Sequence, residues 1–194
     1  MEAVTDTLHA RISYYGDFVA YPAALTALLL LHVGTLQQHA MPSLAALAGG
    51  LLLWTLLEYC LHRWALHRMP IFTALHAAHH SAPRALISTP PWISIPVWLG
   101  AVLLPLWIAA GPCIAVGTTL GVMLGYWYYG IVHHVIHHRV QGSPSSPLAL
   151  LRAWHLRHHY CPARGNFGVT SPIWDYVFGT AIEERRAVSE QRLA

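Results

Sequence analysis

Two long stretches without charge constrain the fold of this chain more than any other feature. No Asp, Glu, Lys or Arg occurs between residues 18 and 57, or between residues 85 and 138, of the 194 residues. A transmembrane helix needs about 20 mostly apolar residues, so each stretch is long enough for two crossings. Charged residues make up only 10% of the chain, whereas roughly 25% is usual in a soluble domain. The sequence therefore predicts an all-α integral membrane protein.

Turn-forming residues near the middle of each stretch predict where the chain reverses. A polar segment at residues 37–39 interrupts the first stretch, and Gly111-Pro112 interrupts the second. Both linkers are short, so each stretch is expected to form a helical hairpin. The four predicted transmembrane helices span residues 18–36, 43–61, 92–110 and 113–132.

The arginines predict the orientation of these helices. All eleven basic residues are arginine, and none lies in either predicted hairpin tip. Because cytoplasmic loops carry the excess of basic residues, both termini should lie in the cytoplasm. Glu2 and Asp6 do not fit a signal peptide, so we expect the N-terminus to be retained.

The chain is expected to form one domain, because its length suits a single core. An interfacial segment is predicted at residues 1–17, followed by the membrane region with three histidine clusters at 18–138. A cytoplasmic helical cap with the last histidine cluster is predicted at 139–182, including a helix at 148–160. Residues 183–194 are expected to form a polar tail.

Histidine is concentrated in four short segments, all on the predicted cytoplasmic side. His155, His158 and His159 are spaced i, i+3 and i+4, so on a helix they project from one face. The segment at residues 76–80 repeats this spacing, and the segment at 133–138 contains two pairs spaced i, i+4. Repeated spacing of this kind is typical of metal ligands. The isolated His32, His9 and His39 are instead interpreted as a packed core residue and two interfacial or loop residues.

The histidines are too numerous for one metal ion, which takes about four to six ligands. The cap is therefore predicted to hold a dinuclear site. His62 and His67 would lie about 140° apart on a regular α-helix, so either the helix ends between them or each binds a different metal. The ten predicted ligands are His62, His67, His76, His79, His80, His133, His137, His155, His158 and His159.

Five further polar residues are predicted to orient the ligands through hydrogen bonds. Glu58 lies one helical turn before His62 and could accept the free N–H of a ligand imidazole, although an ion pair with Arg63 is an alternative. The other four are Asn166, Asp175, His134 and His138. From spacing alone, His134 with His138 could equally replace His133 with His137 as ligands.

Imidazole ligands alone do not select one metal, because they suit iron, zinc, copper and nickel. A hydrolytic zinc site needs only three protein ligands and a water molecule. Two redox-active irons can instead activate dioxygen and attack an unactivated C–H bond, which suits a lipid chain arriving from the bilayer. No nucleic-acid partner is predicted.

Together these motifs resemble the fatty acid hydroxylase and sterol desaturase superfamily of membrane di-iron proteins. The resemblance covers residues 58–180, and the segment from Gly125 to His138 is most similar to fatty acid 2-hydroxylases. It aligns His133 and His137 with the ligands, and Gly130 stands where those enzymes often have Asp. The segment after His80 is closer to short bacterial members, which implies a multi-pass protein of a bacterial inner membrane.

The resemblance implies two iron ions, with O2 as co-substrate and zinc as a possible occupant in a purified sample. It also implies 2-hydroxylation of a fatty acyl chain, free or within a lipid. The sequence has no dinucleotide motif, haem-attachment motif or iron–sulfur cysteine set. Electrons are therefore expected from an external ferredoxin or cytochrome b5-like donor. The alternatives are oxidation of a sterol-like, hopanoid, carotenoid or lipid-headgroup carbon, and a non-catalytic metal-binding protein.

Overall fold

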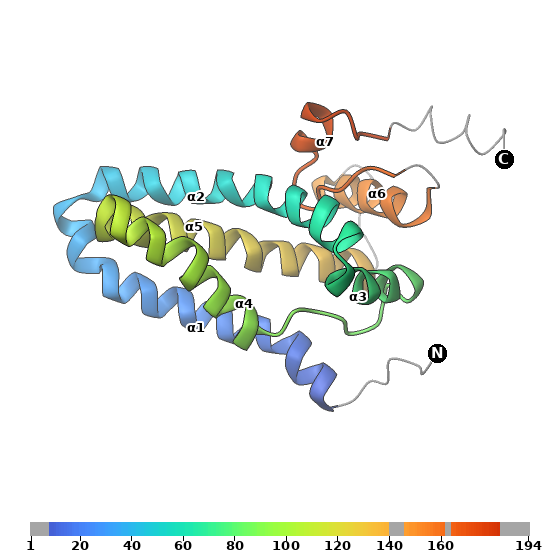
Figure 1. The fold of residues 1–194 in the computed structure, drawn as a ribbon, viewed down its shortest axis with the longest axis horizontal. Helices are drawn as coiled ribbons and strands as arrows, with labels where there is room; N and C mark the ends of the chain where they lie inside the picture. Colours follow the sequence, from blue (N-terminus) through green and yellow to red (C-terminus); the bar gives the residue numbers. More distant parts are fainter. Residues whose placement is uncertain (1–7, 140–145, 162–163, 183–194) are drawn as a thin grey trace. The chain divides into compact units, whose positions relative to one another are not determined.

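The computed structural model describes residues 8–139, 146–161 and 164–182, and every regular element within these ranges is helical (Figure 1). This confirms the predicted all-α class. The elements are α1 (Leu8–Gln38), α2 (Ala40–Cys60), the π-helix η1 (Leu61–Leu66), α3 (Pro70–Ser81), α4 (Pro91–Trp98), the π-helix η2 (Leu99–Leu103), α5 (Leu104–His138), α6 (Pro147–Tyr160) and α7 (Ile173–Val177). The predicted tail at 183–194 lies outside the described residues.

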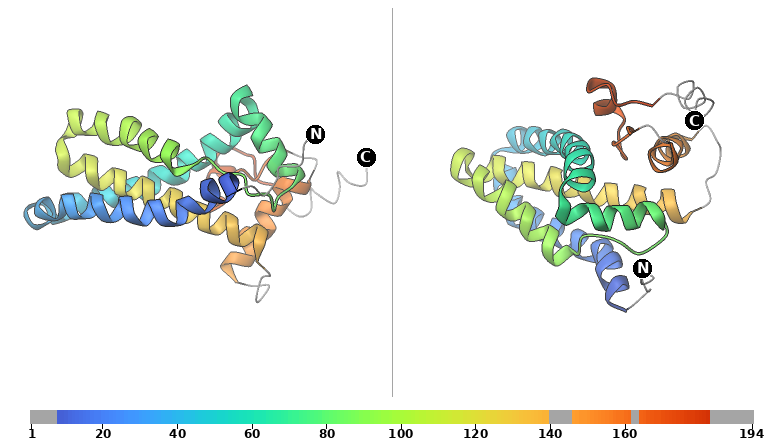
Figure 2. Two further views of the ribbon diagram at one scale, coloured as in Figure 1. Left: turned by 90° about the horizontal axis from the view of Figure 1, so that it is seen from below. Right: turned by 45° about the vertical axis from the view of Figure 1, so that its right-hand side comes forward.

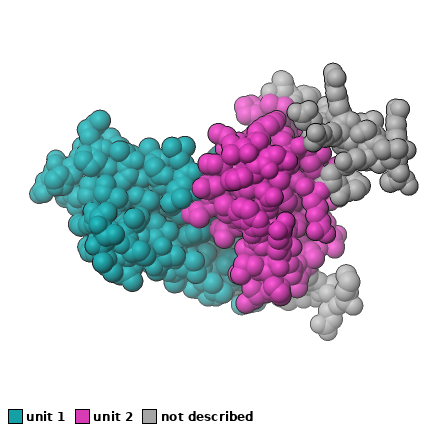
Figure 3. Space-filling model, turned by 45° about the horizontal axis from the view of Figure 1, so that its top comes forward, with its two compact units in different colours: residues 1–54, 85–130 teal, residues 55–84, 131–194 magenta. Residues whose placement is uncertain are grey.

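The chain divides into two compact units, which Figure 3 distinguishes by colour. The first unit comprises residues 1–54 and 85–130, and the second comprises residues 55–84 and 131–194. The first unit therefore contains α1, α4, η2 and most of α2 and α5. The second contains η1, α3, α6, α7 and the last turns of α2 and α5, and it holds every histidine predicted as a metal ligand.

Three helical stretches are long and apolar enough to cross a membrane: Leu8–Thr35, Ala40–Leu66 and Pro91–His138. The third is interrupted at Gly111, whose φ of 78° and ψ of 173° are not helical. Glycine adopts positive φ at little cost because it lacks a Cβ atom. Figure 2 shows the chain turning back in this region, so two helices running in opposite directions form the third stretch. The break lies where the sequence predicts it, between the third and fourth predicted spans.

Within the first unit, α2 and α5 are in close contact. Gly117, Gly121 and Gly125 recur every four residues along α5. A Cβ atom at Gly121 would lie 2.3 Å from the carbonyl oxygen of Leu47, so the two backbones approach as closely as glycine permits. Small residues at a membrane helix interface allow this approach. This glycine stripe was not among the predicted features.

Buried polar groups connect the other helices of the first unit. The indole N–H of Trp98 donates to the Tyr21 hydroxyl at 3.0 Å, and Tyr21 donates to Ser94 at 2.9 Å. His32 is 2% exposed and its Nε2 lies 3.1 Å from the Ser43 hydroxyl. This confirms the interpretation of His32 as a packed, hydrogen-bonded core residue.

Local sequence signals explain where the helices of the second unit begin. Ser146 precedes α6 and its hydroxyl accepts from the Ala149 N–H at 3.2 Å, which caps the helix. Pro147 follows at the first helical position, where a missing N–H costs nothing. Pro70 starts α3 in the same way. The observed α6 begins one residue before the helix predicted at 148–160.

Candidate metal centre

The ten histidines predicted as ligands lie together in the second unit as two groups of five. Within each group, one ligand atom from every residue lies within 4.8 Å of all the others. Group one consists of His62, His67, His76, His80 and His158; group two consists of His79, His133, His137, His155 and His159. His134 and His138 belong to neither group and stack on each other at 4.6 Å between ring centroids. Their ligand role was the alternative that the sequence left open.

A π-helix resolves the awkward spacing of His62 and His67. Residues Leu61–Leu66 form η1, in which hydrogen bonds run from residue i to i+5 instead of i+4. Side chains five residues apart therefore share a face. The two rings lie 5.2 Å apart between centroids with planes inclined by 23°, and both belong to group one. The sequence offered a helix end or two separate metals, and the structure uses neither.

The two segments with the H-x-x-H-H spacing each divide their histidines between the groups in the same way. On α3, His76 and His80 join group one, whereas His79 joins group two. On α6 the pair His155 and His159 joins group two, whereas His158 joins group one. Each helix therefore gives its i, i+4 pair to one group and its i+3 residue to the other. This arrangement agrees with the predicted dinuclear site.

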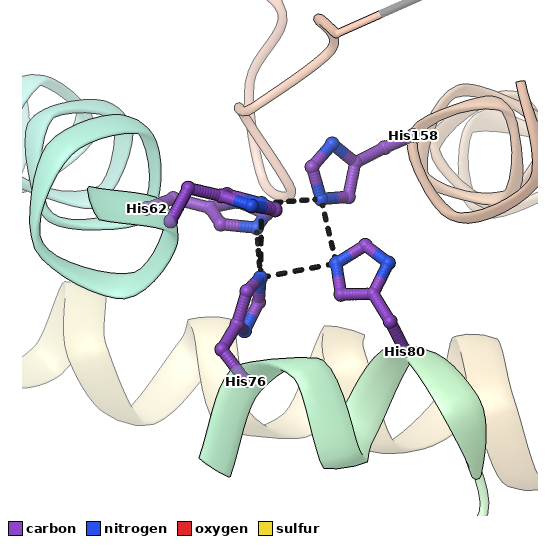
Figure 4. Close-up of side chains that lie close together, drawn as sticks. His62, His76, His80 and His158 are labelled. Carbon is purple, nitrogen blue, oxygen red and sulfur yellow. Dashed lines mark hydrogen bonds between the residues drawn. The ribbon is translucent and has the colours of Figure 1, made fainter. Parts of the chain in front are cut away.

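Ring nitrogens from different elements converge within each group. In group one, His76 Nε2 lies 3.1 Å from His62 Nε2 and 3.0 Å from His80 Nε2. His158 Nε2 completes the set at 3.1 Å from His80 Nε2. Figure 4 shows these four rings pointing toward one another from η1, α3 and α6. In group two, His137 Nε2 lies 3.0 Å from His155 Nε2, which lies 3.0 Å from His159 Nε2.

Two backbone carbonyls determine which ring nitrogens carry hydrogen in group one. His62 Nδ1 lies 2.5 Å from the carbonyl oxygen of Phe167, and His158 Nδ1 lies 2.8 Å from that of Gly165. A carbonyl oxygen only accepts hydrogen bonds, so both Nδ1 atoms must be the donors. In the neutral ring, each Nε2 then presents a lone pair to the centre of the group.

Converging lone pairs repel one another unless a cation lies between them. A neutral imidazole has one N–H, so the Nε2 atoms of His62 and His158 cannot donate to their neighbours once Nδ1 donates to a carbonyl. The donor set therefore fits a metal ion, held by nitrogen atoms and oriented through backbone hydrogen bonds. The two groups can each hold a metal ion.

Burial keeps these imidazoles in the form that binds metals. Loss of solvation, together with the charge of neighbouring histidines, lowers the pKa of His67 to about 4 and of His79 to about 3. Burial similarly lowers the pKa of His158 to about 3, although its hydrogen bond to Gly165 opposes the shift. These rings are neutral at pH 7, and only neutral imidazole has a free lone pair for a metal.

Asp175 fixes the loop that supplies the Phe167 carbonyl. Its two carboxylate oxygens accept the N–H groups of Phe167 and Gly168, both at 2.8 Å, and the Thr180 hydroxyl at 2.7 Å. Asp175 is fully buried. The sequence predicted Asp175 as a residue that orients ligands, and the contacts show that it reaches His62 through the loop backbone.

Glu58 holds the same loop from the α2 side. Its carboxylate accepts the Val169 N–H, the Thr170 N–H at 2.8 Å and the Thr170 hydroxyl. The sequence analysis expected a direct bond to an imidazole or an ion pair with Arg63. Arg63 instead donates to the Tyr59 hydroxyl at 2.5 Å and lies over the Trp64 ring.

Asn166 joins the loop to α6. Its φ of 55° is in the left-handed region, which asparagine tolerates better than most residues. Its side-chain oxygen accepts the Ile182 N–H at 2.7 Å, and its side-chain nitrogen donates to the Trp154 carbonyl at 3.3 Å. The sequence analysis singled out Asn166 and Asp175 but missed the carbonyls of Gly165 and Phe167. Backbone acceptors leave no residue-type signal in a sequence.

Comparison with known proteins gives the chain its family. The family model described as fatty acid hydroxylase matches residues 47–180. The chain belongs to the fatty acid hydroxylase family. All ten histidines of the two groups fall within the matched range, and so do Glu58, Asn166 and Asp175. The predicted resemblance is thereby confirmed.

Relatives of this hydroxylase-family chain include fatty acid 2-hydroxylases, a dihydroceramide fatty acyl 2-hydroxylase and a ceramide very long chain fatty acid hydroxylase. A dihydroceramide fatty acyl 2-hydroxylase of Arabidopsis thaliana is 36% identical over 69% of this chain and 59% of its own length. A ceramide very long chain fatty acid hydroxylase of Schizosaccharomyces pombe is 34% identical over 68% of this chain and 40% of its own length. The fatty acid 2-hydroxylase of Macaca fascicularis is 30% identical over 95% of this chain and 52% of its own length. The chain thus spans about half the length of these relatives.

A solved structure has the same fold. Full-length scs7p, of which only the hydroxylase domain is visible, superimposes with a TM-score of 0.67 and 25% sequence identity. The match covers 86% of this chain and 67% of that one.

Proposed function

We propose that this chain is an O2-dependent lipid hydroxylase that adds a hydroxyl group to carbon 2 of a fatty acyl chain, using two iron ions. The observation that carries this proposal is the pair of five-histidine groups inside the range matched by the fatty acid hydroxylase family. The 2-hydroxylases among the relatives support the position of attack. The ten histidines are the proposed ligands.

The proposed reaction needs electrons from outside the chain. One C–H bond and one O2 molecule, with two electrons and two protons, give one alcohol and one water. Two irons would supply the oxygen activation and the transfer of one oxygen atom to carbon. In this proposal a separate ferredoxin or cytochrome b5-like protein donates the electrons.

The residues of the chain itself have three roles in this proposal. The histidines present neutral Nε2 atoms at neutral pH. The carbonyls of Phe167 and Gly165 hold His62 and His158 in one tautomer and one orientation. Buried histidines limit the access of water to both groups, which protects reactive species from side reactions. The buried histidines are His62, His79, His137, His155 and His158.

We further propose that four helices cross the membrane, with the histidine groups and both termini on the cytoplasmic side. The break at Gly111 supports two crossings within Pro91–His138, since 48 residues exceed what one span requires. The distribution of arginine supports the orientation.

Metal content and product formation test the proposal together. Chain purified without oxygen should contain two irons, and with a reductase system, O2 and lipid it should yield acyl fragments that have gained one oxygen atom at carbon 2. Oxygen on a sterol-like, hopanoid, carotenoid or headgroup carbon instead would overturn the substrate assignment. Tight metal binding without any O2 consumption would favour a metal-binding protein and overturn the enzyme assignment.

A further inference from the structure

The short helix α7 lies against a candidate membrane helix although it is remote from it in sequence. The indole N–H of Trp174 donates to the Thr55 hydroxyl at 2.9 Å. Thr55 belongs to the stretch Ala40–Leu66, eleven residues before its end, which corresponds to about 16 Å along a helix. Both residues belong to the second unit. We call residues 165–170, which supply the Gly165 and Phe167 carbonyls, the metal loop. The segment after the metal loop therefore lies along the side of α2.

Further ring contacts continue this packing toward the end of the same stretch. Phe178 stacks on Tyr59 at 5.2 Å between ring centroids and meets Trp64 edge-on at 6.5 Å. The Tyr59 hydroxyl lies 3.1 Å from the Thr180 hydroxyl. Residues 174–180 thus follow α2 and η1 over the last turns of the candidate span, where a bilayer changes from hydrocarbon to headgroups.

The outer face formed by α7 and the adjoining Phe178 is apolar and carries no charge. Ile173, Tyr176, Val177 and Phe178 are 53%, 58%, 62% and 45% exposed. The one charged residue of this segment, Asp175, is fully buried and binds the metal loop. A soluble surface rarely leaves adjacent large apolar side chains exposed without a partner. Lipid acyl chains would cover these side chains without burying any charged group.

We infer that α7 and the adjoining Phe178 form an interfacial foot, in which Ile173, Tyr176, Val177 and Phe178 insert into the headgroup–acyl boundary of the bilayer. The inference rests on the proposed membrane placement of α2. Helices of this kind bury their apolar face about 5–10 Å into the boundary, and Trp and Tyr are favoured at that depth. Asp175 lies on the inner face of the foot and binds the metal loop. One short helix therefore contacts the membrane on one side and fixes the metal loop on the other.

Spin-label accessibility tests the inference directly. Cys60, Cys113 and Cys161 are replaced by serine, and a nitroxide is attached at V177C in lipid nanodiscs. The matched control is L150C on α6, whose native side chain is 63% exposed. We expect the ratio of O2 to nickel-chelate collisions to be severalfold higher at residue 177 than at residue 150. A residue 177 label as accessible to the chelate as free nitroxide in buffer would overturn the inference.

Photolabelling of the unmodified chain provides a second test that needs no substitution. A phospholipid with a diazirine near its headgroup should form adducts on the tryptic peptide Gly165–Arg185. Adducts on α2 and α5 without any on this peptide would overturn the inference. These readouts are independent of catalysis: lipid-protected α7 in a chain that makes no hydroxylated product would overturn only the proposed function.

Discussion

His62 Nδ1 donates to the carbonyl oxygen of Phe167 at 2.5 Å, and the N–H of that same Phe167 donates to Asp175 at 2.8 Å. One residue of the loop is thus held from both sides, by a carboxylate and by a proposed metal ligand. The orientation of the His62 ring therefore depends on this loop. If the loop moved, the Nε2 lone pair of His62 would no longer point to the centre of group one. Asp175 is therefore a positioning residue, which acts on the centre without touching it.

Replacing Asp175 by Asn should weaken metal binding by group one. An amide offers one acceptor oxygen, so the N–H of either Phe167 or Gly168 loses its partner. Residues that orient metal ligands typically contribute about 10–100-fold in metal affinity. Chelator competition on the purified chain measures the change, and helical content by circular dichroism shows whether the fold is intact. T180V removes the Thr180 hydroxyl, which lies 2.7 Å from Asp175 and 3.1 Å from the Tyr59 hydroxyl, but it leaves the N–H groups of Phe167 and Gly168 paired with Asp175. It should therefore have a smaller effect on metal affinity than D175N. Equal affinity in D175N and the unmodified chain would rule out the positioning role.

Neighbouring histidines on α6 should affect different metal ions. H158A removes a group-one ligand and H159A removes a group-two ligand, so each should lower the metal content from two ions toward one and abolish hydroxylation. H134A is the matched control, because His134 lies in neither group and should leave both ions bound. Elemental analysis per mole of chain provides the measurement. If H134A loses as much metal as H158A, the assignment of ligands to His133 and His137 is wrong.

Much of this centre can be predicted from sequence because helical spacing determines which side chains share a face. The triplets on α3 and α6 required only the 3.6-residue period. The same period left two pairs open at residues 133–138, and the family resemblance was needed to choose His133 and His137. The charge-free stretches likewise predicted the helices and the break at Gly111, since glycine and proline interrupt helices for local steric reasons.

The features that sequence could not predict depend on tertiary contacts or on departures from the regular helix. The π-helix that aligns His62 with His67 adds a residue to a turn, and no residue type requires it. Glu58 was expected to bind an imidazole one turn away, but it binds the backbone of Val169 and Thr170, more than a hundred residues later. The spacing of the glycines in α5 can be read from the sequence, but their contact with Leu47 of α2 cannot, because it depends on how the two helices pack.

The two metal positions should differ in affinity. Group one is oriented by the Phe167 and Gly165 carbonyls, whereas the Nδ1 atoms of His155 and His159 in group two are buried without a hydrogen-bond partner. An unsatisfied buried donor costs about 1–3 kcal/mol, which corresponds to roughly 5–150-fold in binding. Titrating metal-free chain with Fe²⁺ under anaerobic conditions should therefore give two phases. H158A should remove the tight phase and H159A the weak one; the reverse pattern, or a single phase of two ions, would contradict the asymmetry.

Acidification should destabilise the metal-free chain before it reaches the folded-state pKa values. Burial lowers the pKa of His67 to about 4 and of His79 and His158 to about 3, against about 6.5 for histidine in an unfolded chain. Above pH 6.5 the rings are neutral in both states, so their contribution to stability is fully present. Below pH 6.5 the unfolded chain binds protons that the folded chain does not, and stability falls progressively toward pH 4.

The thermal unfolding midpoint of metal-free chain in detergent, measured from pH 7.5 to pH 5, is the test of this dependence. The midpoint should be constant above pH 6.5 and decrease below it, and H79A should show a shallower decrease because one depressed pKa is absent. Bound metal should shift the decrease to lower pH while it remains bound, since protons then compete with the ion for each lone pair. A midpoint that rises on acidification would mean that the rings are protonated in the folded chain, which is incompatible with two groups of metal ligands.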